Sequence, residues 1–284
     1  VFANAGRIEN TGVELVLGAI PLQTKNFQWN LQANFSRNRG NVVSLYQDLE
    51  SYIIAQGPAG VTVEARPGGR MGDIYGNTYV RSDEGKIVYE NGLPLVGPRE
   101  KVGNYNPDWM LGISSGIRYK NFDLSGLFDI RQGGTIYSYT HAVGHESGIL
   151  KTSLPGREEG IIGDGVVVNP DGTFSPNTTR VNAEDYYYGG IYPRQNAEAN
   201  SFDASFIKLR ELSFTYRLHK SLINKVGIQG ASVSFIGSNL ALWTDVPNID
   251  PEAQALNGGT LLPGFEVTQL PSTKSYGFKI NLNF

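Results

Sequence analysis

Residues 274–284 read Lys-Ser-Tyr-Gly-Phe-Lys-Ile-Asn-Leu-Asn-Phe, and this stretch carries the clearest strand pattern in the chain. Apolar and polar residues alternate strictly along it, with the apolar set being Tyr276, Phe278, Ile280, Leu282 and Phe284. A period of two predicts a β-strand with one apolar face and one polar face. Aromatic residues lie near both ends of the apolar face, which is typical of strands that cross a membrane in a β-barrel.

Three interior stretches repeat this alternation, namely residues 27–36, 109–119 and 122–131. Residues 109–119 would extend about 33 Å as a strand. Tilted by about 40–45°, such a strand covers about 25 Å along the membrane normal, which matches the apolar band of an outer-membrane barrel. The same alternation assigns Phe278, Ile280 and Leu282 to the lipid side and Lys279 and Asn281 to the lumen.

Further strands are expected at Arg7–Ile20, where the alternation covers residues 13–19, and at Ser205–Leu218, and another is expected to start at residues 231–235. In residues 205–218 the apolar residues change parity, so we expect a β-bulge near Arg210-Glu211. One helical turn is expected at Lys220–Val226.

The spacing of these strands is uneven. Short turns are expected at Pro21–Asn26, Lys120-Asn121 and His219–Gln229. Long loops are expected at Asn38–Asp108, Gly144–Asn200 and Trp243–Ser272, the first containing short strands at Val61–Ala65, Asp73–Arg81 and Lys86–Tyr89. Short periplasmic turns and long extracellular loops are the layout of bacterial outer-membrane barrels, so the long loops are expected outside the cell.

Composition is compatible with a barrel. The 284 residues are 40% hydrophobic and 18% charged, with a mean hydropathy of −0.26. No run of eighteen apolar residues occurs, which excludes ordinary transmembrane helices. A net charge of −3 gives no basic footprint for nucleic acid. The absence of cysteine excludes a disulfide framework and thiolate metal sites.

Motifs in a fixed order resemble the SusC/RagA-like TonB-dependent transporters of Bacteroidota outer membranes. The first resembles that family's N-x-G-V-E-L strand opening, and the last lies in its C-terminal block. The stretches that carry the resemblance are Asn10–Leu15, Phe27–Asn38, Gly103–Trp109, Ala204–Tyr216, Asn239-Leu240, Asp250–Glu252, Pro263-Gly264 and Leu270–Phe278.

The resemblance implies that residues 1–284 are the C-terminal part of a 22-stranded antiparallel barrel in the outer-membrane lipid bilayer. Such a transporter holds an N-terminal plug, is energised by the TonB complex and is covered by a SusD-like surface lipoprotein. It imports glycans or oligopeptides, needs no cofactor and is not an enzyme. The chain starts at Val1, and we interpret it as a piece that lacks the signal peptide, TonB box and plug.

Two groups of residues are candidates for ligand binding. Four tyrosines of the second long loop could stack on sugar rings or grip a peptide, and they could equally pack against the lipoprotein or each other: Tyr186, Tyr187, Tyr188 and Tyr192. Asp123, Asp129 and Arg131 face the expected lumen and could steer a substrate, although lumen walls are polar in any case.

The histidines and the remaining acidic residues lack the spacing of known metal and catalytic sites. His141, His145 and His219 lack the spacing of a zinc site. Asp245, Asp250 and Glu252 share one loop but lack the spacing of a calcium-binding EF-hand. Glu158 and Glu159 are adjacent, whereas glycoside hydrolysis needs opposed carboxylates.

Two rival hypotheses remain from sequence alone. The first is a soluble all-β carbohydrate-binding module, such as a sandwich or jelly roll. The second is a secreted polysaccharide hydrolase. A sandwich would also alternate, but it would bury its aromatic residues in one core.

Overall fold

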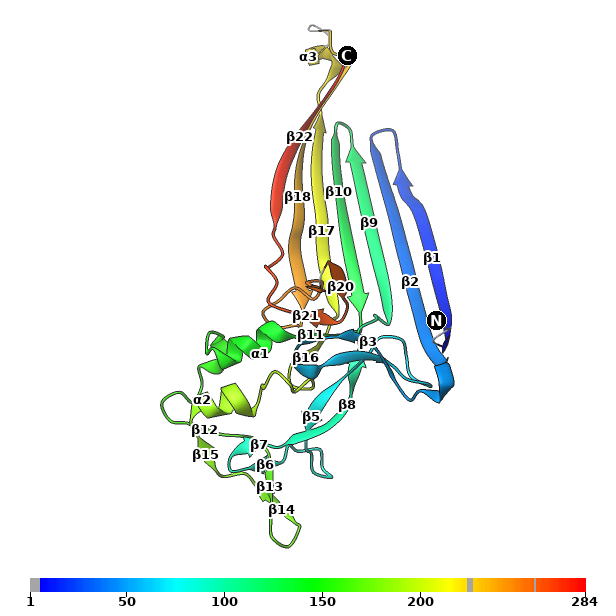
Figure 1. Ribbon diagram of the computed structural model, residues 1–284. Helices are drawn as coiled ribbons and strands as arrows, with labels where there is room; N and C mark the ends of the chain where they lie inside the picture. Colours follow the sequence, from blue (N-terminus) through cyan, green and yellow to red (C-terminus); the bar gives the residue numbers. More distant parts are fainter. Residues whose placement is uncertain (1–5, 224–226, 258) are drawn as a thin grey trace.

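The computed structural model describes residues 6–223, 227–257 and 259–284. Its largest element is a seven-stranded antiparallel sheet, which we call the wall (Figure 1). The strands are, in spatial order, β1 (Gly6–Gln23), β2 (Phe27–Leu45), β9 (Trp109–Tyr119), β10 (Phe122–Gln132), β17 (Phe206–Arg217), β18 (Gly230–Thr244) and β22 (Ser275–Asn283). The expected all-β antiparallel architecture is therefore confirmed.

Strand register sorts the wall into two faces, because residues directly opposite each other in an antiparallel pair point to the same side. One row across all seven strands is entirely apolar: Leu22, Trp29, Ile117, Leu124, Phe214, Phe235 and Phe278. The adjacent row is entirely polar: Gln23, Gln28, Arg118, Asp123, Thr215, Ser234 and Lys279. The two-faced wall predicted from alternation is confirmed, and we call these sides the apolar face and the inner face.

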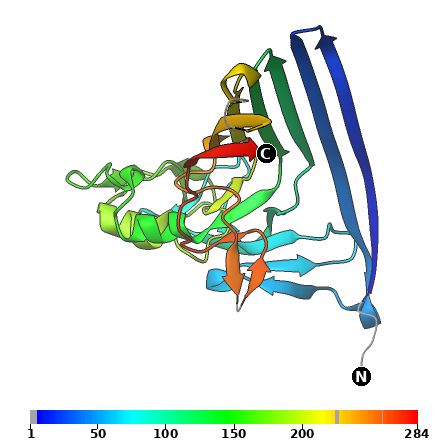
Figure 2. The same ribbon diagram turned by 90° about the horizontal axis from the view of Figure 1, so that it is seen from above.

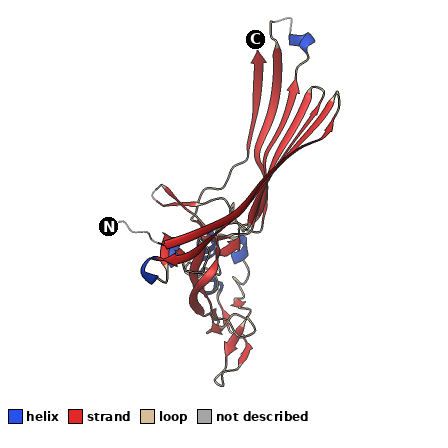
Figure 3. Cartoon of the chain, turned by 90° about the vertical axis from the view of Figure 1, so that its right-hand side faces the viewer, coloured by secondary structure: helices blue, strands red, loops and turns tan. Residues whose placement is uncertain are grey.

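The apolar face is uncovered. Phe278 is 78% exposed, and Leu17, Phe214 and Phe235 are also exposed. A continuous exposed apolar surface of this kind marks a contact with another protein or with a membrane. The wall follows an arc, and its edge strands are β1 and β22 (Figures 2 and 3).

A β-bulge interrupts the wall at Arg210. Register with β10 shifts between Leu127 and Phe128, and register with β18 skips Arg210. The bulge expected near Arg210-Glu211 is confirmed. On the β18 side the extra length is taken up around Asn239, which adopts a left-handed conformation with φ of 53° and is among the residues that tolerate it.

The long connections all lie at one end of the wall and form a second body, which we call the cap (Figures 1 and 3). It consists of loop 1 (residues 46–108), loop 2 (residues 133–205) and loop 3 (residues 245–274 apart from residue 258). Loop 1 carries a four-stranded sheet of β3 (Tyr52–Gln56), β4 (Thr62–Ala65), β5 (Asp73–Tyr79) and β8 (Val96–Asn104), and the pair β6 (Tyr89–Glu90) and β7 (Leu93–Pro94).

Loop 2 contains β11 (Thr135–Ser138), α1 (Tyr139–Glu146), β12 (Ile161–Ile162), β13 (Val166–Val168), β14 (Phe174–Pro176), β15 (Arg180–Val181), α2 (Ala183–Asp185), a π-helical turn at Tyr186–Gly190 and β16 (Ser201–Asp203). Loop 3 contains β19 (Ala255–Asn257), β20 (Thr260–Leu262) and β21 (Phe265–Glu266). Strand β11 pairs with β16 on one side and with β21 on the other, so one sheet joins loops 2 and 3.

All three loops contribute to one hydrophobic core. Its fully buried members include Ile74 of loop 1, Tyr137 of loop 2 and Phe265 of loop 3, and the complete cluster is Val61, Val63, Ile74, Tyr137, Ala197, Ala255, Leu262 and Phe265. The rings of Tyr137 and Phe265 meet edge to face, with centroids 6.0 Å apart. The long loops therefore fold together rather than as separate excursions.

Several expected boundaries were wrong. Strand β2 continues to Leu45, so the first loop starts later than Asn38; both faces of this extension carry polar residues, which conceals the alternation. The strand expected at Lys86–Tyr89 is only the two-residue β6. The strands expected near Val61–Ala65 and Asp73–Arg81 correspond to β4 and β5.

The opposite end of the wall carries only short connections. Turns at residues 24–26 and 120–121 join neighbouring strands, and the third connection contains α3 (Lys220–Ile223). The helical turn expected at Lys220–Val226 is confirmed over its first four residues, and the rest lies outside the described residues. None of the helices in the described ranges has the length and apolarity to cross a membrane.

Candidate functional site

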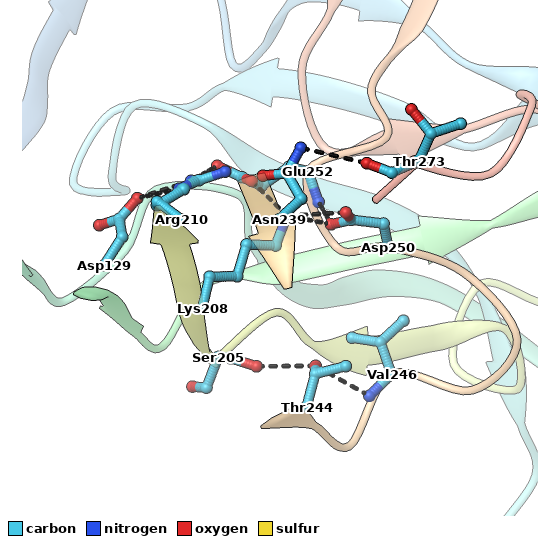
Figure 4. A network of polar contacts seen from close by, with 10 residues as sticks. All are labelled: Asp129, Ser205, Lys208, Arg210, Asn239, Thr244, Val246, Asp250, Glu252 and Thr273. Atoms are coloured by element: carbon cyan, nitrogen blue, oxygen red, sulfur yellow. Dashed lines mark hydrogen bonds and ion pairs between the residues drawn. The ribbon is translucent and has the colours of Figure 1, made fainter. Parts of the chain in front are cut away.

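Wall and cap meet at a charged network on the inner face, beside the bulge of β17 (Figure 4). Lys208 and Arg210 come from β17, and Asp129 comes from β10. Asp250 and Glu252 come from loop 3, which reaches the wall at this point. The network therefore joins two wall strands to the cap.

Lys208 is at the centre of this network and is only 5% exposed. Its Nζ donates to both carboxylate oxygens of Asp250 at 2.7 Å and to Glu252. The Arg210 guanidinium donates to Asp129 Oδ2 from Nη2 at 2.6 Å and from Nε at 3.0 Å. Its Nη2 also donates to Glu252, so Glu252 bridges the two cations.

Both loop carboxylates are held in the ionised form. Burial raises the pKa of Asp250, but hydrogen bonds from Lys208 and from the Glu252 backbone outweigh it and leave the pKa below its usual value. Burial raises the pKa of Glu252 as well, and the hydrogen bonds from Arg210 and Lys208 lower it overall. Within the described residues, no group of three or more acidic or histidine side chains has the arrangement of a metal site.

Asp129 and Arg131, which the sequence singled out on the inner face, both contact the cap region. Asp129 does so indirectly through Arg210. Arg131 donates from Nη2 to the backbone carbonyl of Tyr105 in loop 1. The structure thus places both at the junction of wall and cap, with Asp129 satisfied by a guanidinium and Arg131 by a carbonyl. Asp123 lies far along the same strand, where it pairs with Arg118 and Arg217.

A cleft of about 900 Å³ opens between loop 1 and loop 2. Its charged lining residues are Arg81, Glu100, Lys101, Asp108, Glu198 and Asp203. Arg81 is paired with Glu198, and Lys101 is paired with the buried Asp73 at 2.8 Å. Sequence reasoning missed these residues because they come from stretches far apart in the chain, and no motif marks them.

The tyrosine cluster is largely part of the cap interior. Tyr187 is 9% exposed, and its ring lies 5.4 Å from that of Tyr186. Tyr192 packs on the ring of His145 at 4.2 Å. Of the four tyrosines, Tyr188 alone presents its ring openly, at 60% exposure. The other three pack against neighbouring side chains of the cap, and a ligand-binding role for the four tyrosines stays a prediction.

Two buried histidines complete this aromatic cluster, with ring centroids 4.3 Å apart. Asn200 donates its amide hydrogens to two carbonyls, so its Oδ1 accepts from His141 Nδ1 at 2.9 Å. His145 Nδ1 donates to the His141 carbonyl at 2.9 Å, and its Nε2 accepts from Thr152 at 2.8 Å. Burial lowers the pKa of His141 to about 4 and also lowers the pKa of His145. Both rings are therefore neutral at pH 7.

Comparisons with known proteins agree on one group. No family model matches the chain. TonB-dependent receptor P3 of Formosa agariphila is 26% identical over 310 residues, covering 99% of this chain and 29% of the relative. TonB-dependent receptor SusC of Bacteroides thetaiotaomicron is 27% identical over 165 residues, covering 53% of this chain and 16% of SusC.

The fold is similar to a solved structure of the RagAB peptide transporter, with a TM-score of 0.66 and 22% identity over 99% of this chain. The chain spans about three tenths of that protein and of receptor P3. The named relatives are receptors and transporters, in agreement with the expectation that the chain is not an enzyme. The chain is therefore similar over nearly its whole length to a segment of a TonB-dependent receptor, and its fold is similar to that of a segment of the RagAB transporter.

Proposed function

We propose that residues 1–284 form the C-terminal part of a closed 22-stranded barrel in the outer membrane. In this proposal the complete protein imports glycans or oligopeptides, is energised by the TonB complex and works with a SusD-like surface lipoprotein. The observation that carries the proposal is the pair of neighbouring rows across the wall, one wholly apolar and one wholly polar.

A soluble sheet would cover its apolar face with another layer of structure. In the described chain the cap instead contacts the inner face, through Asp250 and Glu252, while Phe278 and most of its row remain exposed. Lipid on the apolar face and water on the inner face would satisfy both rows. The proposed barrel therefore has the inner face as its lumen wall.

The connections are long at one end of the wall and short at the other, and this difference supports one orientation in the membrane. Outer-membrane barrels have short periplasmic turns and longer extracellular loops. We accordingly assign the cap to the outside of the cell and the turn at residues 120–121 to the periplasm. The cap is then the part of this chain available to a surface lipoprotein and to substrate.

Substrate contacts are proposed at three places. Tyr188 offers an open ring for stacking on the cap surface. The cleft between loops 1 and 2 carries carboxylates and cations that suit a polar substrate. Asp129 and Arg131 lie where the cap meets the proposed lumen. RagAB, whose solved structures this chain resembles in fold, is a peptide importer, and this supports import as the general activity.

The test uses the full-length protein in its own outer membrane. We expect it in the detergent-extracted membrane fraction, accompanied by a lipoprotein in mild detergent, and we expect substrate uptake to stop when TonB is deleted. Recovery of the native protein in the soluble fraction would support the rival carbohydrate-binding module and end the transporter proposal. Hydrolysis of a glycan by the purified protein would support the rival enzyme.

A further inference from the structure

Loop 3, residues 245–274 apart from residue 258, contacts both the inner face of the wall and the centre of the cap, and we call it the strap. At its cap end, Leu262 and Phe265 belong to the shared core. The neighbouring Glu266 is fully buried and accepts hydrogen bonds from Ser138 Oγ at 2.9 Å and from the Thr140 N–H at 3.2 Å. The strap is thus anchored in the cap by packing and by neutral donors at the start of α1.

At its wall end the strap is held by ion pairs instead. Asp250 and Glu252 bind the wall through Lys208 and Arg210, and Lys208 and Asp250 are almost completely buried. The free-energy cost of removing such charges from water nearly cancels the free energy of their attraction. A buried ion pair is therefore weak evidence for stability. An apolar contact would have fixed the strap equally well, as Phe265 shows at the other end.

The β-bulge in β17 also places a charged side chain at this contact. Relative to β10, the bulge inserts Arg210 as an extra residue in β17, where it reaches both Asp129 and Glu252. Bulges often re-aim a side chain beside a functional site. The side chain of Glu252 is 34% exposed, so the network is accessible to water at the one residue that both cations share.

We propose that Lys208 and Arg210 are positioning residues that form an ionic latch, which holds the strap against the inner face and releases it at Glu252 during transport. In the proposed barrel the latch lies at the cap end of the lumen, and its release frees the wall end of the strap while the cap end stays anchored. This inference rests on the proposed function, because only a lumen gives the release a role.

The first measurement is amide hydrogen exchange of strap residues 245–257 in the full-length protein in lipid nanodiscs. Glu252→Gln keeps the shape of the side chain and removes the charge that both cations share. We expect strap exchange to rise about tenfold or more, as the loss of charge-assisted hydrogen bonds implies, with α1 and β9 unchanged. Unchanged strap exchange, or an equal rise throughout wall and cap, would overturn the latch.

Two further variants sharpen the result. Lys208→Met should act in the same direction, and its effect should be less than additive with Glu252→Gln, since both break one network. Lys279→Met is the matched control: it removes a lysine from the same inner face that has no ion pair among the described residues. An additive double variant, or a strap loosened by Lys279→Met, would contradict the latch.

Uptake of substrate by whole cells separates the latch from the transporter proposal. We expect Glu252→Gln to change the uptake rate and Lys279→Met to leave it at the wild-type value. If the wild-type protein imports nothing, the proposed function fails, whereas the exchange data still decide whether the latch exists. If Glu252→Gln loosens the strap but imports at the wild-type rate, the strap is merely structural and the inference is wrong.

Discussion

Acidification should open the cap around α1. His141 is 6% exposed, and its neutral ring is fixed by Asn200. Its pKa is about 4 when buried and 6.5 when free. Because the folded pKa is the lower one, the opened cap binds more protons, so stability is fully present above pH 6.5 and is lost as the pH falls towards 4.

The size of the effect follows from these two pKa values. Between pH 7.5 and pH 5, proton uptake at a group with pKa 6.5 when open and about 4 when closed costs the closed state about 2 kcal/mol, or about 30-fold in the opening equilibrium. His145 acts in the same direction, since burial lowers its pKa too. The tyrosine rings packed on these histidines, Tyr187 and Tyr192, remain neutral in this range because burial raises their pKa.

Hydrogen exchange of residues 139–146 measures this opening, after correction for the intrinsic pH dependence of exchange. The series should end at pH 5, above the usual pKa values of carboxyl groups. His141→Asn keeps an N–H donor for Asn200 and cannot titrate, so it should lower stability at pH 7.5 and flatten the pH dependence. His219→Asn, in the turn at the opposite end, should behave as wild type. An opening equilibrium that is equal at pH 7.5 and pH 5 in the wild-type protein would refute the reasoning.

Three further predictions concern the wall, the topology and the cap core. Ile280→Arg should destabilise the protein by about 2–4 kcal/mol in refolding from urea into lipid, whereas Asn281→Arg should cost little; equal costs would mean that β22 does not separate lipid from lumen. Protease added to intact cells should cut the cap within residues 144–200 and spare Lys120, and early cleavage at Lys120 would reverse the orientation. Phe265→Ala should destabilise the cap by about 3–5 kcal/mol, because it empties a fully buried site; unaltered protease resistance of the cap would contradict a shared core.

The sequence predicted the strands of the wall because the same two-residue alternation extends over many residues of each strand. The period-two pattern of residues 109–119 and 274–284 identified strands and faces because every second side chain meets the same surroundings. The parity change in residues 205–218 predicted the bulge at Arg210 for the same reason. Both patterns lie within single strands, so they can be recognised in one sequence.

The cap could not be predicted in this way. Its strands are mostly two to five residues long, too short to display a period. Its core joins Ile74, Tyr137 and Phe265 across wide sequence gaps, and the latch joins Lys208 to Asp250, 42 residues later. The tyrosines illustrate the same limit, because exposure separates Tyr188 from Tyr187 although the two are adjacent.

The shared core of the cap has a consequence for how such proteins can diversify. Since Val61, Tyr137 and Phe265 come from three different loops and pack on one another, none of these loops is a separable cassette. Recombination that exchanges one loop between two homologues should leave mismatched partners in the other two, whereas exchange of all three together should succeed. New specificity is therefore expected to arise by point substitutions on the cap surface, around positions such as Tyr188, or by wholesale replacement of the cap.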